Sequence, residues 1–220
     1  VKDGLPYRKS VGRFLLDWLD DRDYIEATTS GSTGVPKQIH LKKQGMVNSA
    51  LATGEYLKLS PKDRALLCLP TDFIAGKMML IRAIVLGLHI DIIRPSSMPL
   101  SLTSKDYDFC AMIPLQAAKS LTDLPRVKKV ILGGASIDGG LEAKLQNIST
   151  EVYSSYGMTE TISHIAMRKV NHTEEHETTY KAMPNVIFTQ DERHCLVINA
   201  PLIADHPVVT NDMVNLISHN

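Results

Sequence analysis

The sequence predicts an α/β fold, with mostly parallel sheets flanked by helices and a β-rich C-terminal portion. Between residues 38 and 155, short apolar runs alternate with segments of helical periodicity. This alternation is typical of strands that are joined in parallel by helices. After residue 164 the helical periodicity ends, and short alternating runs separated by turn residues take over.

The elements of the first half follow from these patterns in order. A helix is expected from Ser10, which would cap it, because Val11, Phe14 and Trp18 fall on one face. A Gly-rich loop should then join strand 24–28 to strand 38–42, where polar and apolar residues alternate. The next expected elements are a helix at 43–58, a strand at 65–69, a helix at 74–86 and a strand at 89–93.

The second half continues the alternation and then changes character. Its expected elements are strands at 109–113 and 127–132, a helix at 141–148, and a strand at 152–155. Runs 185–189 and 195–199 flank the turn 190–193 as a hairpin, and 208–217 is the last strand. We therefore expect one domain over 1–220, with an α/β part at 1–163 and a β-rich part at 164–220.

Composition excludes several classes of function. The 220 residues carry 24 basic and 24 acidic side chains, so no strong global field attracts nucleic acid or an anionic membrane. No apolar run reaches the length of a membrane span, and no signal-peptide pattern is present. The three cysteines are far apart, which argues against a disulfide framework or a zinc site. A reducing cytoplasm fits best, and a homodimer stays open.

The Gly-rich loop reads Thr29-Ser-Gly-Ser-Thr-Gly-Val-Pro-Lys37 and suits a polyphosphate. Its backbone N–H groups, hydroxyls and lysine are donors for phosphate oxygens, and its glycines allow close approach. A Walker-type P-loop is disfavoured, because here the lysine follows Pro36 and opens a strand instead of a helix. The alternative without a ligand is a surface turn of the same composition.

Together with two later segments, this loop resembles the acyl-adenylate-forming superfamily of acyl- and aryl-CoA ligases, luciferases and peptide-synthetase adenylation domains. Ser154-Ser-Tyr-Gly-Met-Thr-Glu-Thr161 is similar to the second core motif of that family. Between the two motifs, Gly133-Gly-Ala135 resembles the strand that lines the adenine and acyl pockets. Thr210-Asn-Asp212 stands where the family has Thr-Gly-Asp, with asparagine as a mild departure. The resemblance implies the large N-terminal domain of such an enzyme.

The resemblance implies an ATP/AMP site and a set of residues with roles in it. Tyr156 would stack on adenine, Ser155 could contact its polar edge, and Asp212 would accept from the ribose hydroxyls. The full set of ATP/AMP-binding candidates is Thr29, Ser30, Gly31, Ser32, Thr33, Gly34, Lys37, Gly133, Gly134, Ala135, Ser155, Tyr156, Gly157, Met158, Thr159 and Asp212.

Three residues are implied to act in catalysis. Lys37 would grip the β- and γ-phosphates, and Thr159 would hydrogen-bond the α-phosphate during attack by the substrate carboxylate. Glu160 would be the Mg²⁺ ligand, as a hard oxygen donor. ATP, Mg²⁺ and coenzyme A as co-substrate are the implied cofactors, and the implied partner is a small-molecule carboxylic acid.

The acyl pocket of this family is built from variable positions. Phe73 lies where the family places an aromatic or histidine gate, and His164 could lie near the acyl group. The compact form of the chain and the segment Tyr180-Lys-Ala-Met-Pro-Asn-Val186 are similar to the short o-succinylbenzoate–CoA ligases of menaquinone biosynthesis. A second carboxylate on the substrate would need a cation, and Lys77 is the predicted residue, with Arg82 beyond it.

Other functions remain open on the sequence. The family continues into a hinge and a small C-terminal lid domain with a catalytic lysine, and neither is expected within this chain, so full turnover is not expected of it. A non-catalytic nucleotide-binding domain is one rival. Amino-acid activation is another, because Asp72 could hold a substrate amine, and other aryl- or acyl-CoA ligases are a third.

Overall fold

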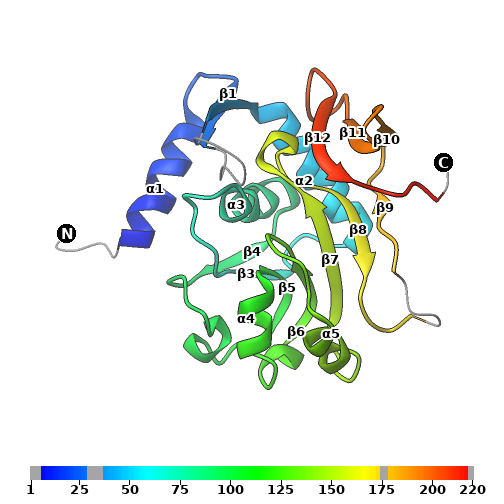
Figure 1. Ribbon diagram of the computed structural model, residues 1–220. Helices are drawn as coiled ribbons and strands as arrows, with labels where there is room; N and C mark the ends of the chain where they lie inside the picture. The colour runs from blue at the N-terminus through cyan, green and yellow to red at the C-terminus, as the bar shows by residue number, and fades with distance from the viewer. Residues whose placement is uncertain (1–5, 29–36, 174–177, 218–220) are drawn as a thin grey trace.

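The computed structural model describes residues 6–28, 37–173 and 178–217 and places them in three sheets with flanking helices (Figure 1). A seven-stranded sheet has the order β4-β3-β5-β6-β7-β8-β9. Its strands are β3 (Arg64–Leu67), β4 (His89–Ile92), β5 (Tyr107–Met112), β6 (Val127–Leu132), β7 (Glu151–Gly157), β8 (His164–Lys169) and β9 (Lys181–Ala182). The α/β class expected from the sequence is confirmed.

The first five strands of this sheet, β4 to β7 in spatial order, run parallel, and helices join them. Helix α3 (Ile74–Leu86) leads outward from β3 to β4, whereas α4 (Pro114–Lys119) and α5 (Gly139–Leu145) lead from β5 to β6 and from β6 to β7. Because such crossovers are right-handed, α3 covers one face of the sheet and α4 and α5 the other (Figure 1). The chain therefore reverses direction between β3 and β5, and ligands of open α/β sheets bind at this kind of switch point.

Helix α2 (Lys43–Leu57) packs against α3 on the same side of the sheet. The bounds of α3 are those predicted. The helix ends at Leu86 because Gly87 follows as a left-handed C-cap with a φ of 67°. Met78, Met79 and Ile81 of α3 are fully buried, so this helix is apolar around most of its circumference. Helix α3 is thus a central element, and residues on its different faces meet different parts of the molecule.

Strands β1 (Tyr24–Thr28) and β2 (Gln38–Lys42) form an antiparallel hairpin, as expected. Helix α1 (Pro6–Leu19) precedes it and begins four residues earlier than predicted. Ser10 is therefore not its cap: proline opens the first turn, and the Ser10 hydroxyl hydrogen-bonds with Thr71 Oγ1 at 2.8 Å. That partner is 61 residues away, so the local pattern could not reveal it.

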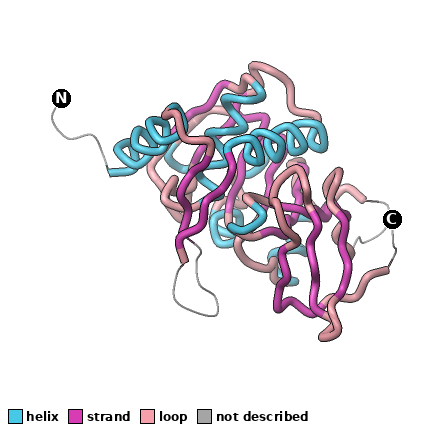
Figure 2. The backbone as a smooth tube through the Cα atoms, turned by 90° about the horizontal axis from the view of Figure 1, so that it is seen from above, coloured by secondary structure: helices cyan, strands magenta, loops and turns pink. Residues whose placement is uncertain are grey.

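Residues after 164 divide between two sheets. Strands β8 and β9 pair antiparallel onto β7 and so continue the large sheet. Strands β10 (Ile187–Gln190), β11 (Cys195–Asn199) and β12 (Val208–Met213) form a separate antiparallel sheet, with the expected hairpin between β10 and β11. Figure 2 shows this small sheet on the opposite side of the molecule from α1.

Among the described residues, no helix is long and apolar enough to cross a membrane.

Candidate nucleotide site

The carboxyl ends of β6 and β7 carry the residues expected to surround adenine. Gly133, Gly134 and Ala135 follow β6 directly, and Gly134 has a φ of 80°, which favours glycine. A Cβ on Gly133 would lie 2.6 Å from Ser155 Oγ, so this wall is thin where it meets β7. The hydroxyl of Ser155 donates to the Leu132 carbonyl at 3.1 Å and ties the two strands together.

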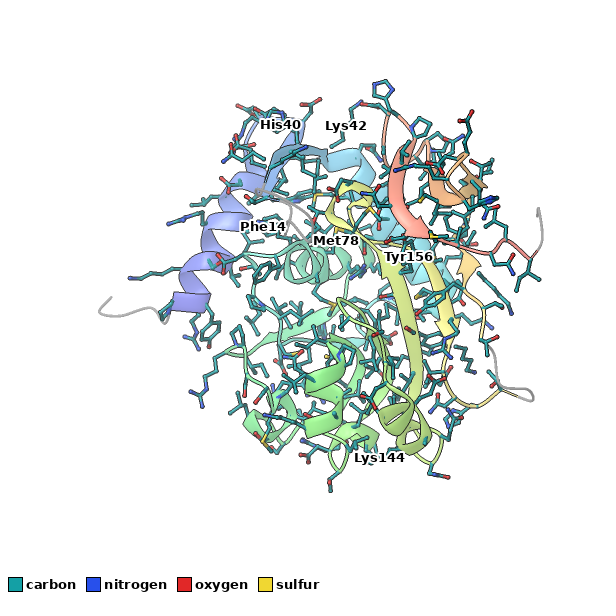
Figure 3. All side chains as sticks on the ribbon, in the orientation of Figure 1. Phe14, His40, Lys42, Met78, Lys144 and Tyr156 are labelled. Atoms are coloured by element: carbon teal, nitrogen blue, oxygen red, sulfur yellow. The ribbon has the colours of Figure 1, made fainter. Side chains whose placement is uncertain are left out.

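Tyr156 and Asp212 are brought together by a hydrogen bond between the large and the small sheet. The Tyr156 hydroxyl donates to Asp212 Oδ2 at 2.5 Å, across 56 residues of sequence. Burial and the neighbouring carboxylate raise the pKa of Tyr156, so the phenol stays protonated and donates. Figure 3 labels Tyr156 beside β12, on the side of the molecule opposite Phe14. An aromatic ring next to an exposed carboxylate suits a nucleoside, which has a flat base and ribose hydroxyls.

The turn after Tyr156 is tightly folded. A Cβ on Gly157 would lie 2.2 Å from the Ser163 carbonyl oxygen, so only glycine fits where β7 meets the start of β8. Ile162 has a φ of 66°, which is unusual for a β-branched residue, and its side chain is buried. It packs against α2, where a Cβ on Gly45 would be 2.8 Å from Ile162 Cδ1. Strained backbone of this kind is common at functional sites.

Thr159 and Glu160 lie in this turn, at the start of the 3₁₀ helix Thr159–Thr161. The buried Thr161 hydroxyl bonds with backbone atoms of Met158 and Ser163 and holds the turn closed, while Glu160 is exposed. Among the described residues, no three His, Cys, Asp or Glu side chains gather as a metal cage. A single carboxylate nevertheless fits Mg²⁺, which keeps several waters and is usually shared with substrate phosphates.

Most of the expected phosphate loop falls between two described parts of the chain, 6–28 and 37–173. Thr29, Ser30, Gly31, Ser32, Thr33 and Gly34 lie outside the described residues. Lys37 is described and exposed immediately before β2. The hairpin that carries the loop is the part of this motif that the structure describes.

Two of the substrate-site candidates, Phe73 and Lys77, lie at the start of α3. Phe73 is the N-cap residue of α3 and is 61% exposed. The Lys77 ammonium lies 5.5 Å from the centre of the Phe14 ring of α1. Burial lowers the pKa of Lys77, while Asp72 and Asp17 oppose that effect. Lys77 therefore faces α1 and a hollow of about 430 Å³ between α1 and the ends of β3 and β4.

Arg82 lies on another face of α3 and reaches the motif turn. Five residues separate it from Lys77, which corresponds to about 140° around a helix. Arg82 is 3% exposed, and its guanidinium donates to Ser163 Oγ at 2.6 Å and to Thr53 Oγ1 at 3.3 Å. No carboxylate within the described parts of the chain offsets the burial, which lowers the pKa of Arg82 to about 10. Arg82 is thus a buried cation that is bonded to Ser163, three residues after Glu160 in the sequence, and no anionic partner for it is found among the described residues.

His164 completes a ring of hydrogen bonds with these residues. Its Nε2 lies 3.1 Å from Thr53 Oγ1, and its Nδ1 lies 3.4 Å from Ser163 Oγ. The Thr53 hydroxyl donates to the Ser49 carbonyl, so it can only accept from His164. His164 therefore carries its proton on Nε2, and its Nδ1 accepts from the Ser163 hydroxyl. Burial and the charge of Arg82 lower the pKa of His164 well below its usual value, which keeps the ring neutral.

Sequence reasoning missed Thr53 and Ser163 and could not rank Arg82 above Lys77. Thr53 and Ser163 are single hydroxyl residues in apolar surroundings, and their partners are 29 and 81 residues away. The available signal was the single arginine at position 82 within the otherwise apolar run from Met78 to Val85. A charge inside such a run indicates either a partner or a ligand.

The fold, with its parallel-dominated large sheet, flanking helices and small antiparallel sheet, is that of the large N-terminal domain of acyl-adenylate-forming enzymes. A family model described as "AMP-binding enzyme" matches residues 27–190. The chain therefore belongs to the AMP-binding enzyme family.

Relatives with described activities fall in the same family. A 2-succinylbenzoate–CoA ligase of Salmonella typhimurium is 25% identical over 173 residues, which are 78% of this chain and 38% of the ligase. A nonribosomal peptide synthetase of Aspergillus fumigatus is 29% identical over 153 residues, or 67% of this chain and 7% of the synthetase. The chain thus spans well under half the length of these relatives.

Solved structures share the architecture. An AMP-forming acyl-CoA synthetase/AMP-acid ligase II-like protein of Dyadobacter fermentans superimposes with a TM-score of 0.88 at 35% identity, covering all of this chain and 64% of the other. The O-succinylbenzoate coenzyme A synthetase of Bacillus subtilis, in complex with ATP and magnesium ion, superimposes with a TM-score of 0.71 at 22% identity. That match covers 83% of this chain and 42% of the synthetase. At that identity the second comparison supports the fold alone.

Proposed function

We propose that this chain is the nucleotide-binding part of an AMP-forming acid–CoA ligase, which activates a carboxylic acid as an acyl-adenylate. The observation that carries the proposal is the Tyr156–Asp212 hydrogen bond, which joins the proposed base platform to the proposed ribose acceptor. Thr159 and Glu160 follow Tyr156 by three and four residues. Membership of the AMP-binding family supports the same assignment. Transfer to coenzyme A is proposed from the relatives that are named as CoA ligases.

ATP and Mg²⁺ are the proposed cofactors. Tyr156 would stack on adenine, the carboxylate of Asp212 would accept from ribose, and Gly133 to Ala135 would form the wall beside the base. Thr159 would donate to the α-phosphate, and Glu160 would hold Mg²⁺ together with phosphate oxygens and water. Bound Mg²⁺ would supply charge neutralisation at the phosphates. Lys37 and the loop 29–34 are proposed to grip the leaving pyrophosphate.

A dicarboxylate such as o-succinylbenzoate is the proposed acid. The supporting observation is Arg82, because an unpaired buried cation costs several kcal/mol and an anion bound beside it would offset that cost. Its guanidinium bonds to Ser163, so it lies beside the turn that carries Thr159 and Glu160. Ligases for this acid among the relatives point the same way. Arg82 replaces Lys77 as the cation that we propose for the second carboxylate, since Lys77 faces α1.

Direct binding to the chain tests this proposal without requiring turnover. The chain is titrated by calorimetry with AMP and with adenosine acyl sulfamates, stable analogues of acyl-adenylates, that carry either o-succinylbenzoyl or benzoyl. We expect both acyl sulfamates to bind more tightly than AMP, and the o-succinylbenzoyl analogue to exceed the benzoyl analogue at least about tenfold. Equal affinity for the two would contradict the dicarboxylate, and no saturable binding of any nucleotide would contradict adenylate formation itself.

A further inference from the structure

Tyr180 lies beside the proposed base platform at the start of β9. In the large sheet, Ser154 of β7 pairs with Arg168 of β8, and Tyr156 pairs with Ala166, which in turn pairs with Ala182 of β9. Directly paired residues share a face of a sheet. The small side chains of Ala166 and Ala182 therefore leave room on that face for two tyrosine rings.

The rings of Tyr180 and Tyr156 meet in that space. Their centres are 6.5 Å apart and their planes cross at 65°, which is an edge-to-face arrangement. The Tyr180 hydroxyl lies 2.6 Å from Ser154 Oγ, and Ser154 is 2% exposed. Tyr180 thus reaches across β8 and is anchored on β7, two residues before Tyr156.

A buried ion pair fixes the other side of Tyr180. The Arg168 guanidinium lies 6.0 Å from the centre of the Tyr180 ring. It donates to both carboxylate oxygens of Glu142 of α5, at 2.6 and 3.1 Å, and both side chains are largely buried. A bidentate pair in such surroundings has a defined geometry. The Tyr180 ring is therefore held by Arg168 and by Ser154 at once.

Tyr156 is consequently restrained at two points: its hydroxyl at Asp212 and its ring edge at Tyr180. We propose that Tyr180 is a positioning residue of the nucleotide site, which holds the Tyr156 ring at the angle that stacks on a purine base. This inference rests on the proposed function, because it assigns a task to Tyr156 as the adenine platform. Tyr180 itself does not touch the reacting atoms.

The test is a double-mutant cycle on AMP affinity, measured by calorimetry on the full chain. Tyr180→Ala should lower AMP affinity about 3- to 10-fold, as expected for loss of an edge-to-face aromatic contact. Tyr180→Phe keeps the ring and should bind within twofold of the unsubstituted chain. In a Tyr156→Leu background, Tyr180→Ala should have no further effect, because nothing is left to position.

A matched control exists on the opposite face of β7. Tyr56 of α2 forms a similar edge-to-face pair with Tyr153, with centres 6.0 Å apart. Tyr56→Ala should leave AMP affinity within twofold. The proposal is overturned if Tyr180→Ala binds AMP normally, if its effect persists unchanged in the Tyr156→Leu background, or if Tyr56→Ala weakens AMP equally. If the unsubstituted chain shows no saturable AMP binding, the nucleotide site itself is wrong and this inference falls with it.

Discussion

Gly157→Ala is expected to lose roughly 2–3 kcal/mol of unfolding free energy and most of its affinity for AMP. The added Cβ would lie 2.2 Å from the Ser163 carbonyl oxygen and 2.6 Å from His164 Cα. Both are backbone atoms, so no side chain can rotate away and the start of β8 must move. Thr159 and Glu160 lie in the loop closed by this contact and would move with it. Urea unfolding and AMP calorimetry on one preparation measure both effects.

Gly139→Ala is the matched control for this variant. Gly139 opens α5, and a Cβ there meets nothing within 4 Å. Alanine should be neutral or should stabilise by up to about 1 kcal/mol, because it restricts the unfolded chain. AMP affinity should not change. If Gly157→Ala were as stable as the unsubstituted chain and bound AMP equally well, the turn would be looser than the structure indicates.

Arg82→Met should abolish the preference for a dicarboxylate without weakening the fold. Removing one partner of a desolvated charge pair costs at least about 2 kcal/mol, so the o-succinylbenzoyl sulfamate should bind at least about 30-fold more weakly. The benzoyl sulfamate should bind as before. Because Arg82 is a buried cation without a described anionic partner, replacing it with methionine should leave the urea midpoint unchanged or raise it.

Lys77→Met separates the two cations on α3. Lys77 contacts the Phe14 ring, so its substitution should leave the affinities for both acyl sulfamates unchanged. Loss of the dicarboxylate preference in Lys77→Met, with Arg82→Met unaffected, would return the role to the residue that sequence reasoning favoured. A large loss of stability in Arg82→Met would instead indicate that its bonds to Thr53 and Ser163 are mainly structural.

The sequence predicted those elements whose ends carry local signals. Helix α3 was placed correctly because its apolar run ends at Gly87, and β6 because an apolar run ends at Gly133. Helix α4 was missed, since six residues are too few to show helical periodicity. The pairing of β8 with β7 was not foreseen, because alternation predicts a strand and does not identify its neighbour.

The candidate site was predictable only as far as contiguous motifs reach. Tyr156, Glu160 and Asp212 were proposed from short segments that resemble family motifs, and the structure places Tyr156 against Asp212. The contact between Arg82 and Ser163 joins residues 81 positions apart and leaves no local trace. The rotation of α3 about its own axis decides that Lys77 faces α1 and that Arg82 faces the turn after Tyr156. Packing against the rest of the molecule sets this rotation.

A crystal structure of this chain grown with AMP would test the central claim most directly. We expect the adenine ring to stack on Tyr156, with a ribose hydroxyl within hydrogen-bond distance of Asp212 and the phosphate directed toward Thr159. AMP bound elsewhere, for example in the hollow between α1 and the ends of β3 and β4, would contradict the assignment of the nucleotide site.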